Sequence, residues 1–178
     1  MPKRLIALAI ALIAMTAAIG FMAMQPDNFT IEGQNNKQAA EIGVAAGKKL
    51  PEFALTSLEG ASVKVGSSPK VTIINFWATW CPPCREEMPE LEKFSRLHGD
   101  QVDLYTINLQ EPPAKVTAFL NQNQYTLKVL LDSDGQVAKI FRVNSIPTTI
   151  VADSKGIIKY RKSGPVTASE LEGVLSGL

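Results

Sequence analysis

The apolar residues of this chain form two kinds of run, one typical of strands and one typical of helices. Val71–Trp77 is a continuous run rich in β-branched residues, which is typical of a central strand covered on both faces. From Pro82 to Leu97 the apolar residues recur at helical spacing with charged residues between them, which predicts an amphipathic helix. A buried strand followed closely by an amphipathic helix is therefore expected in the middle of the chain.

Strands and helices alternate along the rest of the chain. The first two expected strands flank a short turn and form a hairpin. In the last helix, Thr167 as N-cap with Glu170 three residues later predicts a capping box. Strands that alternate with helices imply a three-layer α/β sandwich. The remaining expected elements are the strands Phe53–Ser57, Ser62–Val65, Val102–Leu109, Val129–Leu131, Thr148–Ala152 and Gly156–Arg161, and the helices Pro112–Asn123, Gln136–Phe141 and Thr167–Leu178.

The N-terminus carries a membrane-targeting pattern. Lys3 and Arg4 precede an apolar run of 20 residues that ends at Met24. As a helix, such a run spans about 30 Å, the thickness of a bilayer core. Residues 1–24 are therefore expected to form a signal-anchor transmembrane helix, with a cleaved signal peptide as the alternative. Because the positive charges come first, the domain is expected on the extracytoplasmic side of the cell membrane.

The rest of the chain divides into a tether and one domain. Residues 25–49 are rich in polar and small residues without apolar periodicity, which predicts a tether, and residues 50–178 are long enough for a full core. The net charge is +1 and the Lys and Arg residues are scattered, so no nucleic-acid partner is predicted. One His and two Cys are too few for a zinc or iron–sulfur site, so no metal or other cofactor is expected.

The two cysteines, Cys81 and Cys84, lie three residues apart. A disulfide between them closes too short a loop to stabilise the fold much, so the pair suits reversible redox chemistry better than a structural role. The unpaired N–H groups and the dipole at a helix start lower the pKa of a thiol. Cys81 is therefore expected to face solvent and attack a substrate disulfide, and Cys84 to resolve the mixed disulfide. Covalent haem attachment is excluded, because it requires His where Arg85 stands.

Two stretches resemble the thioredoxin-like proteins of the ResA, TlpA and CcmG group. They are Asn75–Pro89, which contains the motif Trp-Cys-Pro-Pro-Cys, and Ile146–Thr149. The resemblance extends from Phe53 to the C-terminus and implies a thioredoxin-like fold with a central mixed sheet and an N-terminal β-hairpin. It also implies a membrane-anchored enzyme that reduces protein disulfides, such as those of apocytochrome c during cytochrome c maturation, with electrons from a membrane thiol donor.

The resemblance assigns roles around the redox pair. Cys81 is the implied nucleophile and Cys84 the implied resolving thiol. Pro147 is expected to be cis and to face the disulfide. Trp80, which precedes the nucleophile, and Ile146 are expected to border the groove that binds the substrate.

Glu87 is expected to accept and release protons during thiol-disulfide exchange. It lies three residues after the second cysteine, and the resemblance makes it a buried carboxylate with a raised pKa. Thioredoxin carries a buried Asp at the position of Asn75. Because Asn cannot accept a proton at working pH, this task falls to Glu87. The roles of Glu111, which falls near another acidic position of the ResA-like proteins, and of Trp77 and Arg85 stay open.

Two other functions stay open alongside the reductase. One is an oxidase or isomerase that introduces disulfides, and the other is a binding module without turnover. Strong oxidants of this class stabilise the reduced thiolate. Pro82 and Pro83 offer neither a charge nor an N–H group between the cysteines, which favours a reductase.

Overall fold

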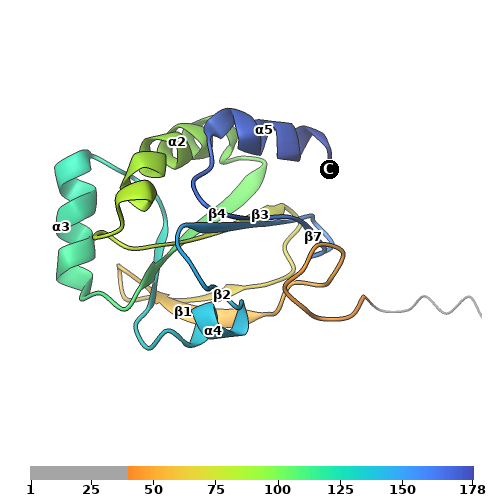
Figure 1. The fold of residues 1–178 in the computed structure, drawn as a ribbon, viewed down its shortest axis with the longest axis horizontal. Helices are drawn as coiled ribbons and strands as arrows, with labels where there is room; N and C mark the ends of the chain where they lie inside the picture. Colours follow the sequence, from red (N-terminus) through yellow and green to blue (C-terminus); the bar gives the residue numbers. More distant parts are fainter. Residues whose placement is uncertain (1–39) are drawn as a thin grey trace, which may run out of the picture. The chain divides into compact units, whose positions relative to one another are not determined.

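The computed structural model describes residues 40–178 (Figure 1). The expected transmembrane helix of residues 1–24 and the first part of the expected tether lie outside the described residues, so both stay predictions. None of the helices within residues 40–178 has the length and apolar character that crossing a bilayer requires.

A seven-stranded mixed sheet forms the centre of the domain. The strands are β1 (Phe53–Ser57), β2 (Ser62–Val65), β3 (Val71–Trp77), β4 (Val102–Leu109), β5 (Val129–Asp132), β6 (Thr148–Ala152) and β7 (Ile158–Ser163). Their order in the sheet is β2-β1-β5-β4-β3-β6-β7. The three central strands β5, β4 and β3 are parallel, whereas the outer pairs are antiparallel. The pair of β1 and β2 is the predicted N-terminal hairpin.

Four helices of residues 40–178 cover the two faces of the sheet (Figure 1): α2 (Pro82–His98), α3 (Pro113–Asn123), α4 (Gln136–Ile140) and α5 (Ala168–Ser176). Buried residues of α2, α3 and α5 pack in one core cluster, and those of α4 pack in a second cluster. The predicted three-layer α/β sandwich is therefore confirmed.

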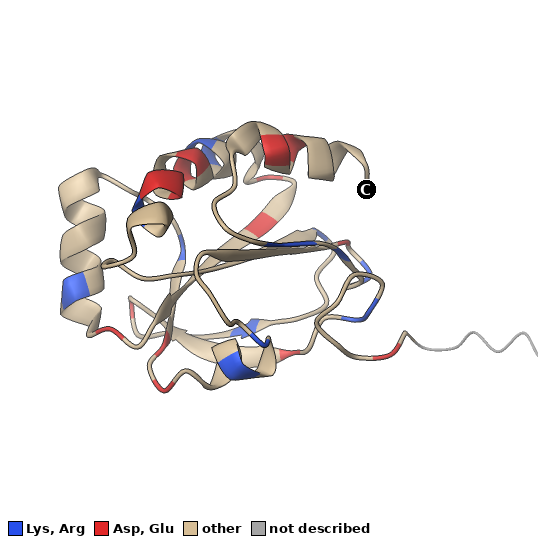
Figure 2. Cartoon of the chain, in the orientation of Figure 1, with Lys and Arg blue, Asp and Glu red and all other residues tan. Residues whose placement is uncertain are grey.

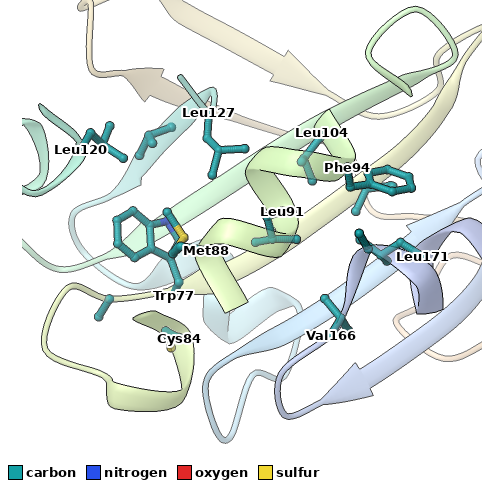
Figure 3. Packing of buried hydrophobic residues seen from close by; sticks show 14 of the residues in the cluster. Trp77, Cys84, Met88, Leu91, Phe94, Leu104, Leu120, Leu127, Val166 and Leu171 are labelled. Atoms are coloured by element: carbon teal, nitrogen blue, oxygen red, sulfur yellow. The ribbon is translucent and has the colours of Figure 1, made fainter. Parts of the chain in front are cut away.

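Strand β3 supplies buried residues to both core clusters. Ile73 and Trp77 belong to the cluster that contains Met88 of α2 (Figure 3), whereas Ile74 and Phe76 belong to the cluster on the other face. Each of these side chains is at most 1% exposed. Successive side chains of a strand point to opposite faces, so a strand covered on both sides is apolar throughout. The expectation of a doubly covered strand is thus confirmed.

The described part of the predicted tether pairs with the domain. Lys49 forms a parallel bridge with Ile42 and an antiparallel bridge with Ile157, and the N–H of Gly47 donates to the carbonyl oxygen of Ile158 at 2.8 Å. The sequence pattern assigns these residues to the tether because they lack apolar periodicity. Backbone hydrogen bonds form without such a pattern. In the folded protein they hold this segment against the edge of the sheet.

Thr167 caps α5, as predicted. Its Oγ1 accepts a hydrogen bond from the N–H of Glu170 at 3.1 Å. In a complete capping box the carboxylate of Glu170 would accept from the N–H of Thr167. Here it accepts from the Tyr160 hydroxyl at 2.7 Å and from Lys162 Nζ at 2.7 Å. The first turn of α5 is therefore tied to β7.

Replacing Thr167 with Ala is expected to lower the free energy of unfolding by about 1 kcal/mol, because the N–H of Glu170 loses its side-chain acceptor. Urea unfolding at equilibrium, followed by circular dichroism, measures this change. Thr167→Ser is the matched control, since it keeps the accepting hydroxyl. Equal losses in the two variants would show that the methyl group, rather than the cap, stabilises the helix.

Candidate active site

The two cysteines form a disulfide where the chain passes from β3 into α2. Cys81 is the N-cap residue of α2, and its Sγ accepts from the N–H of Cys84 at 3.3 Å. The Cα atoms of the pair are 5.3 Å apart. Cys84 begins the buried face of the helix (Figure 3) and is fully buried, while Cys81 is only 3% exposed. In this oxidised form Cys81 therefore faces solvent less than its position at the helix start predicts.

The loop before β6 covers Cys81. The carbonyl oxygen of Ile146 lies 3.7 Å from the Sγ of Cys81, and the Ile146–Pro147 peptide bond is cis, as the resemblance implies. Trp80 is 63% exposed, and together with Ile146 it lines a cavity of about 430 Å³. The fold thus brings the two segments that carry the resemblance together around the first cysteine.

Glu87 is buried, unlike its neighbour Glu86. Acidic residues recur along α2 (Figure 2), but the side chain of Glu87 is only 1% exposed, whereas Glu86 is exposed. Asn75 Nδ2 donates to its Oε1 at 2.8 Å, and the N–H of Val166 donates to its Oε2 at 2.9 Å. The carboxylate therefore links the active-site helix to the central strand and to the segment before α5.

Burial raises the pKa of Glu87 from its ordinary value of 4.5 to about 7. The hydrogen bonds from Asn75 and Val166 and the positive charge of Lys162 lower this pKa, but they do not outweigh the loss of solvent. A group with a pKa near the ambient pH can both accept and release a proton. The sequence-based expectation of a raised pKa agrees with this environment.

Asn75 orients the carboxylate of Glu87 from the centre of the sheet. It lies on β3 opposite Thr149 of β6, and its Nδ2 also donates to Thr149 Oγ1 at 3.0 Å. Because Asn75 carries no titratable group, it holds the carboxylate in place without competing for its proton.

Glu111 holds the loop that leads into the disulfide. Glu111 is buried, and its carboxylate accepts from the N–H and the hydroxyl of Thr79 at 2.7 and 2.6 Å, and from Asn108 Nδ2 at 2.9 Å. Burial opposes ionisation, but the hydrogen bonds from Lys115 and Thr79 outweigh it and hold the pKa of Glu111 below its ordinary value. The sequence does not reveal the contact between Glu111 and Thr79, because the two residues lie 32 positions apart in the chain.

The structure also places the two other residues whose roles the sequence leaves open. Trp77 is fully buried and packs against Phe119 with 5.4 Å between ring centroids, which makes it a core residue. Arg85 is exposed, and its guanidinium lies 6.0 Å from the centroid of the same Phe119 ring. Its charge therefore stands at the surface of the first turn of α2.

These features together define a class of enzyme. A disulfide caps a helix directly after a buried central strand, a loop with a cis-proline covers its first sulfur, and a buried carboxylate lies one turn further along the helix. A thiolate formed at such a helix start is stabilised as a nucleophile and can exchange with other disulfides. The site is that of a thiol-disulfide oxidoreductase with a thioredoxin-like fold.

The chain belongs to the Redoxin family, whose model matches residues 45–175. It is 30% identical over 178 residues to the thiol-disulfide oxidoreductase ResA of Geobacillus kaustophilus (strain HTA426), an alignment that covers 99% of this chain and 97% of the relative. It is 35% identical over 124 residues to the sporulation thiol-disulfide oxidoreductase A of Bacillus subtilis (strain 168), covering 67% of this chain and 75% of the relative.

Solved structures agree with this assignment. The crystal structure of StoA from Bacillus subtilis matches with a TM-score of 0.64 and 33% identity, over 70% of this chain and 96% of that chain. The crystal structure of a putative thiol:disulfide interchange protein DsbE from Chlorobium tepidum matches with a TM-score of 0.69 and 27% identity, over 76% of this chain and 98% of that chain. The protein is a thiol-disulfide oxidoreductase of the ResA, StoA and DsbE group.

The raised pKa of Glu87 is expected to make the stability of the oxidised protein depend on pH. Between pH 4.5 and about 7 the folded protein keeps the proton of Glu87, whereas the unfolded chain has lost it. The stability that this proton contributes is therefore complete below pH 4.5 and is lost as the pH rises through about 7. The loss amounts to about 3 kcal/mol over this interval.

Urea unfolding of the oxidised wild type and of Glu87→Gln between pH 4 and pH 8 measures this dependence. Gln does not titrate, so the wild type is expected to lose stability relative to the variant as the pH rises from about 4.5 to about 7. Two stability curves that run parallel across this range would show that Glu87 has the same pKa in the folded and the unfolded chain, so that burial does not raise it.

Proposed function

We propose that this enzyme reduces disulfides of proteins on the extracytoplasmic side of the cell membrane, such as those of apocytochrome c before haem attachment. One observation carries the direction of the reaction. The Sγ of Cys81 accepts the N–H of Cys84, while the two residues between them are prolines and have no N–H to donate. A thiolate with fewer donors is less stabilised, and a less stable reduced form makes the couple a stronger reductant.

Glu87 supports the same direction. An ionised carboxylate one helical turn beyond Cys84 repels a thiolate and raises the pKa of the thiol. Strong oxidants of this class have the opposite arrangement, in which the reduced thiolate is stabilised. The motif and its surroundings therefore favour donation of electrons to a substrate disulfide.

Each cysteine has its own step in the reaction. The thiolate of Cys81 attacks one sulfur of the substrate disulfide, forms a mixed disulfide and releases the other substrate sulfur as a thiol after protonation. The thiolate of Cys84 then attacks the Sγ of Cys81, which frees the reduced substrate and restores the Cys81–Cys84 disulfide. A membrane thiol donor returns the pair to the dithiol form. No cofactor takes part in these steps.

Glu87 accepts the proton of Cys84 before the second step. Cys84 is fully buried in the oxidised structure, so bulk water is a poor base for it. The carboxylate of Glu87 lies one helical turn away and has a pKa of about 7, close enough to that of a thiol for transfer in either direction. Trp80, Ile146 and Pro147 contact the substrate around its reacting cysteine.

The membrane location follows from the N-terminal sequence. Residues 1–24 anchor the chain and the following residues carry the domain away from the bilayer. The alignment with ResA of Geobacillus kaustophilus covers nearly the whole length of both chains, which supports one organisation for both. An anchored reductase meets protein substrates only on the side where its domain lies.

Trapping tests the proposed reaction. The full-length Cys84→Ser variant, reduced and in detergent, is expected to hold an oxidised peptide of the sequence type Cys-x-x-Cys-His as a mixed disulfide, because the resolving thiol is absent. Mass spectrometry detects the adduct, and Cys81→Ser is the control that is expected to trap nothing. A reduction potential of about −120 mV for the wild type would contradict the proposal of a reductase and favour an oxidase.

Replacing Glu87 with Gln is expected to slow the resolution of the mixed disulfide by roughly 100-fold at pH 7, because Cys84 loses its proton acceptor. Stopped-flow measurement of disulfide formation after mixing with the oxidised peptide gives this rate. Glu90→Gln is the matched control, since Glu90 lies on the same helix and accepts from the N–H of Ala168 at 2.9 Å. Equal rates in the two variants would remove Glu87 from the proton transfer.

A further inference from the structure

Three ionisable side chains gather where β7 meets α5, on the side of the sheet that carries Glu87. Tyr160 and Lys162 lie on β7, and Glu170 lies in the first turn of α5. Lys162 Nζ donates to both carboxylate oxygens of Glu170, at 2.9 and 2.7 Å, and the Tyr160 hydroxyl donates to Oε1 at 2.7 Å. The thiol-disulfide exchange described above uses none of these three side chains.

The sheet places Lys162 in one row with the residues that hold Glu87. Asn75 on β3 is paired with Thr149 on β6, and Thr149 is paired with Lys162 on β7. Directly paired residues of antiparallel strands point to the same face of a sheet. Asn75 points toward α2, where its amide donates to Glu87. Lys162 therefore leaves the sheet on the face of Glu87, two strands from Asn75, which is about 10 Å.

The start of α5 borders Glu87 from another side. Helix α5 packs beside α2 (Figure 1), and the N–H of Val166, just before α5, donates to Glu87 Oε2 at 2.9 Å. Burial raises the pKa of Tyr160, and the hydrogen bond to Glu170 and the negative charges of Glu170 and Glu87 raise it further. The Tyr160 hydroxyl therefore lies close enough to both carboxylates to feel their charges.

Lys162 is the cation of this cluster. Within residues 40–178 it is the residue whose charge, as distinct from a hydrogen bond, lowers the pKa of Glu87 against the larger effect of burial. The charged neighbours of Glu87 on its own helix are directed elsewhere, since Arg85 and Glu86 are exposed and Glu90 accepts from the first backbone N–H of α5 at 2.9 Å. The charge closest in effect to Glu87 therefore comes from β7.

We propose that Lys162 and Glu170 are positioning residues that together set the pH range in which Glu87 exchanges its proton. The positive charge of Lys162 favours the ionised form of Glu87, and Glu170 holds Lys162 in place and cancels part of its charge. The inference rests on the proposed function, because that function gives the proton of Glu87 its use.

The position of the Glu170 carboxylate supports this assignment. In a complete capping box it would accept from the N–H of Thr167. The ion pair with Lys162 and the hydrogen bond from Tyr160 direct it to β7 instead. The carboxylate therefore serves the cluster beside Glu87 rather than the end of its own helix.

Infrared spectroscopy of the oxidised full-length protein in detergent tests the inference, because the disulfide-bonded cysteines do not titrate. The band of a protonated carboxyl group that disappears in Glu87→Gln belongs to Glu87, and its intensity against pH gives the titration midpoint. Lys162→Met is expected to raise this midpoint by about 0.5 pH unit, because the ionised form loses a nearby positive charge. Glu170→Gln is expected to lower the midpoint by a similar amount, because the charge of Lys162 is then no longer cancelled.

The opposite directions distinguish an electrostatic role from a structural one. Both variants break the same ion pair, so a purely structural role shifts both midpoints in one direction or shifts neither, and either result overturns the inference. Lys159→Met is the matched control, since it removes another lysine of β7, whose Nζ lies 3.3 Å from Asp153 Oδ2. This control is expected to keep the wild-type midpoint, and a shift equal to that of Lys162→Met would also overturn the inference.

Stopped-flow measurement separates the inference from the proposed function. The pH midpoint of mixed-disulfide resolution is expected to move up in Lys162→Met and down in Glu170→Gln, as the infrared midpoint does. An unmoved rate midpoint beside shifted infrared midpoints would overturn the positioning role. If Glu87→Gln resolves the mixed disulfide as fast as the wild type, the part of Glu87 in the proposed function fails, whereas opposite infrared shifts still support the action of the charge pair on Glu87.

Discussion

The burial of β3 on both faces is the constraint on which the rest of the site depends. A helical layer covers each side of this strand, so every side chain along it has a set direction. The alternation that places Ile73 and Trp77 under α2 also directs Asn75 toward that helix, where its amide holds Glu87. The end of the same strand leads the chain to Cys81 at the start of α2. The redox motif therefore takes its position from the packing of the core.

Two buried carboxylates near the motif have pKa values shifted in opposite directions, because their surroundings differ. Glu111 receives several hydrogen bonds and the charge of Lys115, so it stays ionised and holds the loop at Thr79 in place. Glu87 receives fewer donors in a more buried position, and its pKa rises to about 7. The first suits a fixed structural anchor, and the second suits a group that exchanges a proton during the reaction.

In the proposed function, reactivity and contact with the substrate involve partly different segments of the chain. The disulfide and Glu87 lie in the first turns of α2 and its N-cap, whereas the cavity beside Trp80 is lined also by the end of β4 and by the loop between α4 and β6. Loops tolerate substitution better than the buried strand that positions the motif, so the lining of this cavity can vary while the motif keeps its place.

The sequence alone determined the redox pair, the order of strands and helices and the cap of α5, because each leaves a local pattern: the spacing of Cys81 and Cys84, the apolar run of β3, and Thr167 before its helix. The burial of Glu87 was implied by the resemblance of its motif, whereas only the tertiary structure decided that Glu111 is buried, how it meets Thr79, and how the carbonyl oxygen of Ile146 comes to lie over Cys81. These contacts join residues far apart in the chain, and their energies depend on solvent exclusion, which no local pattern records.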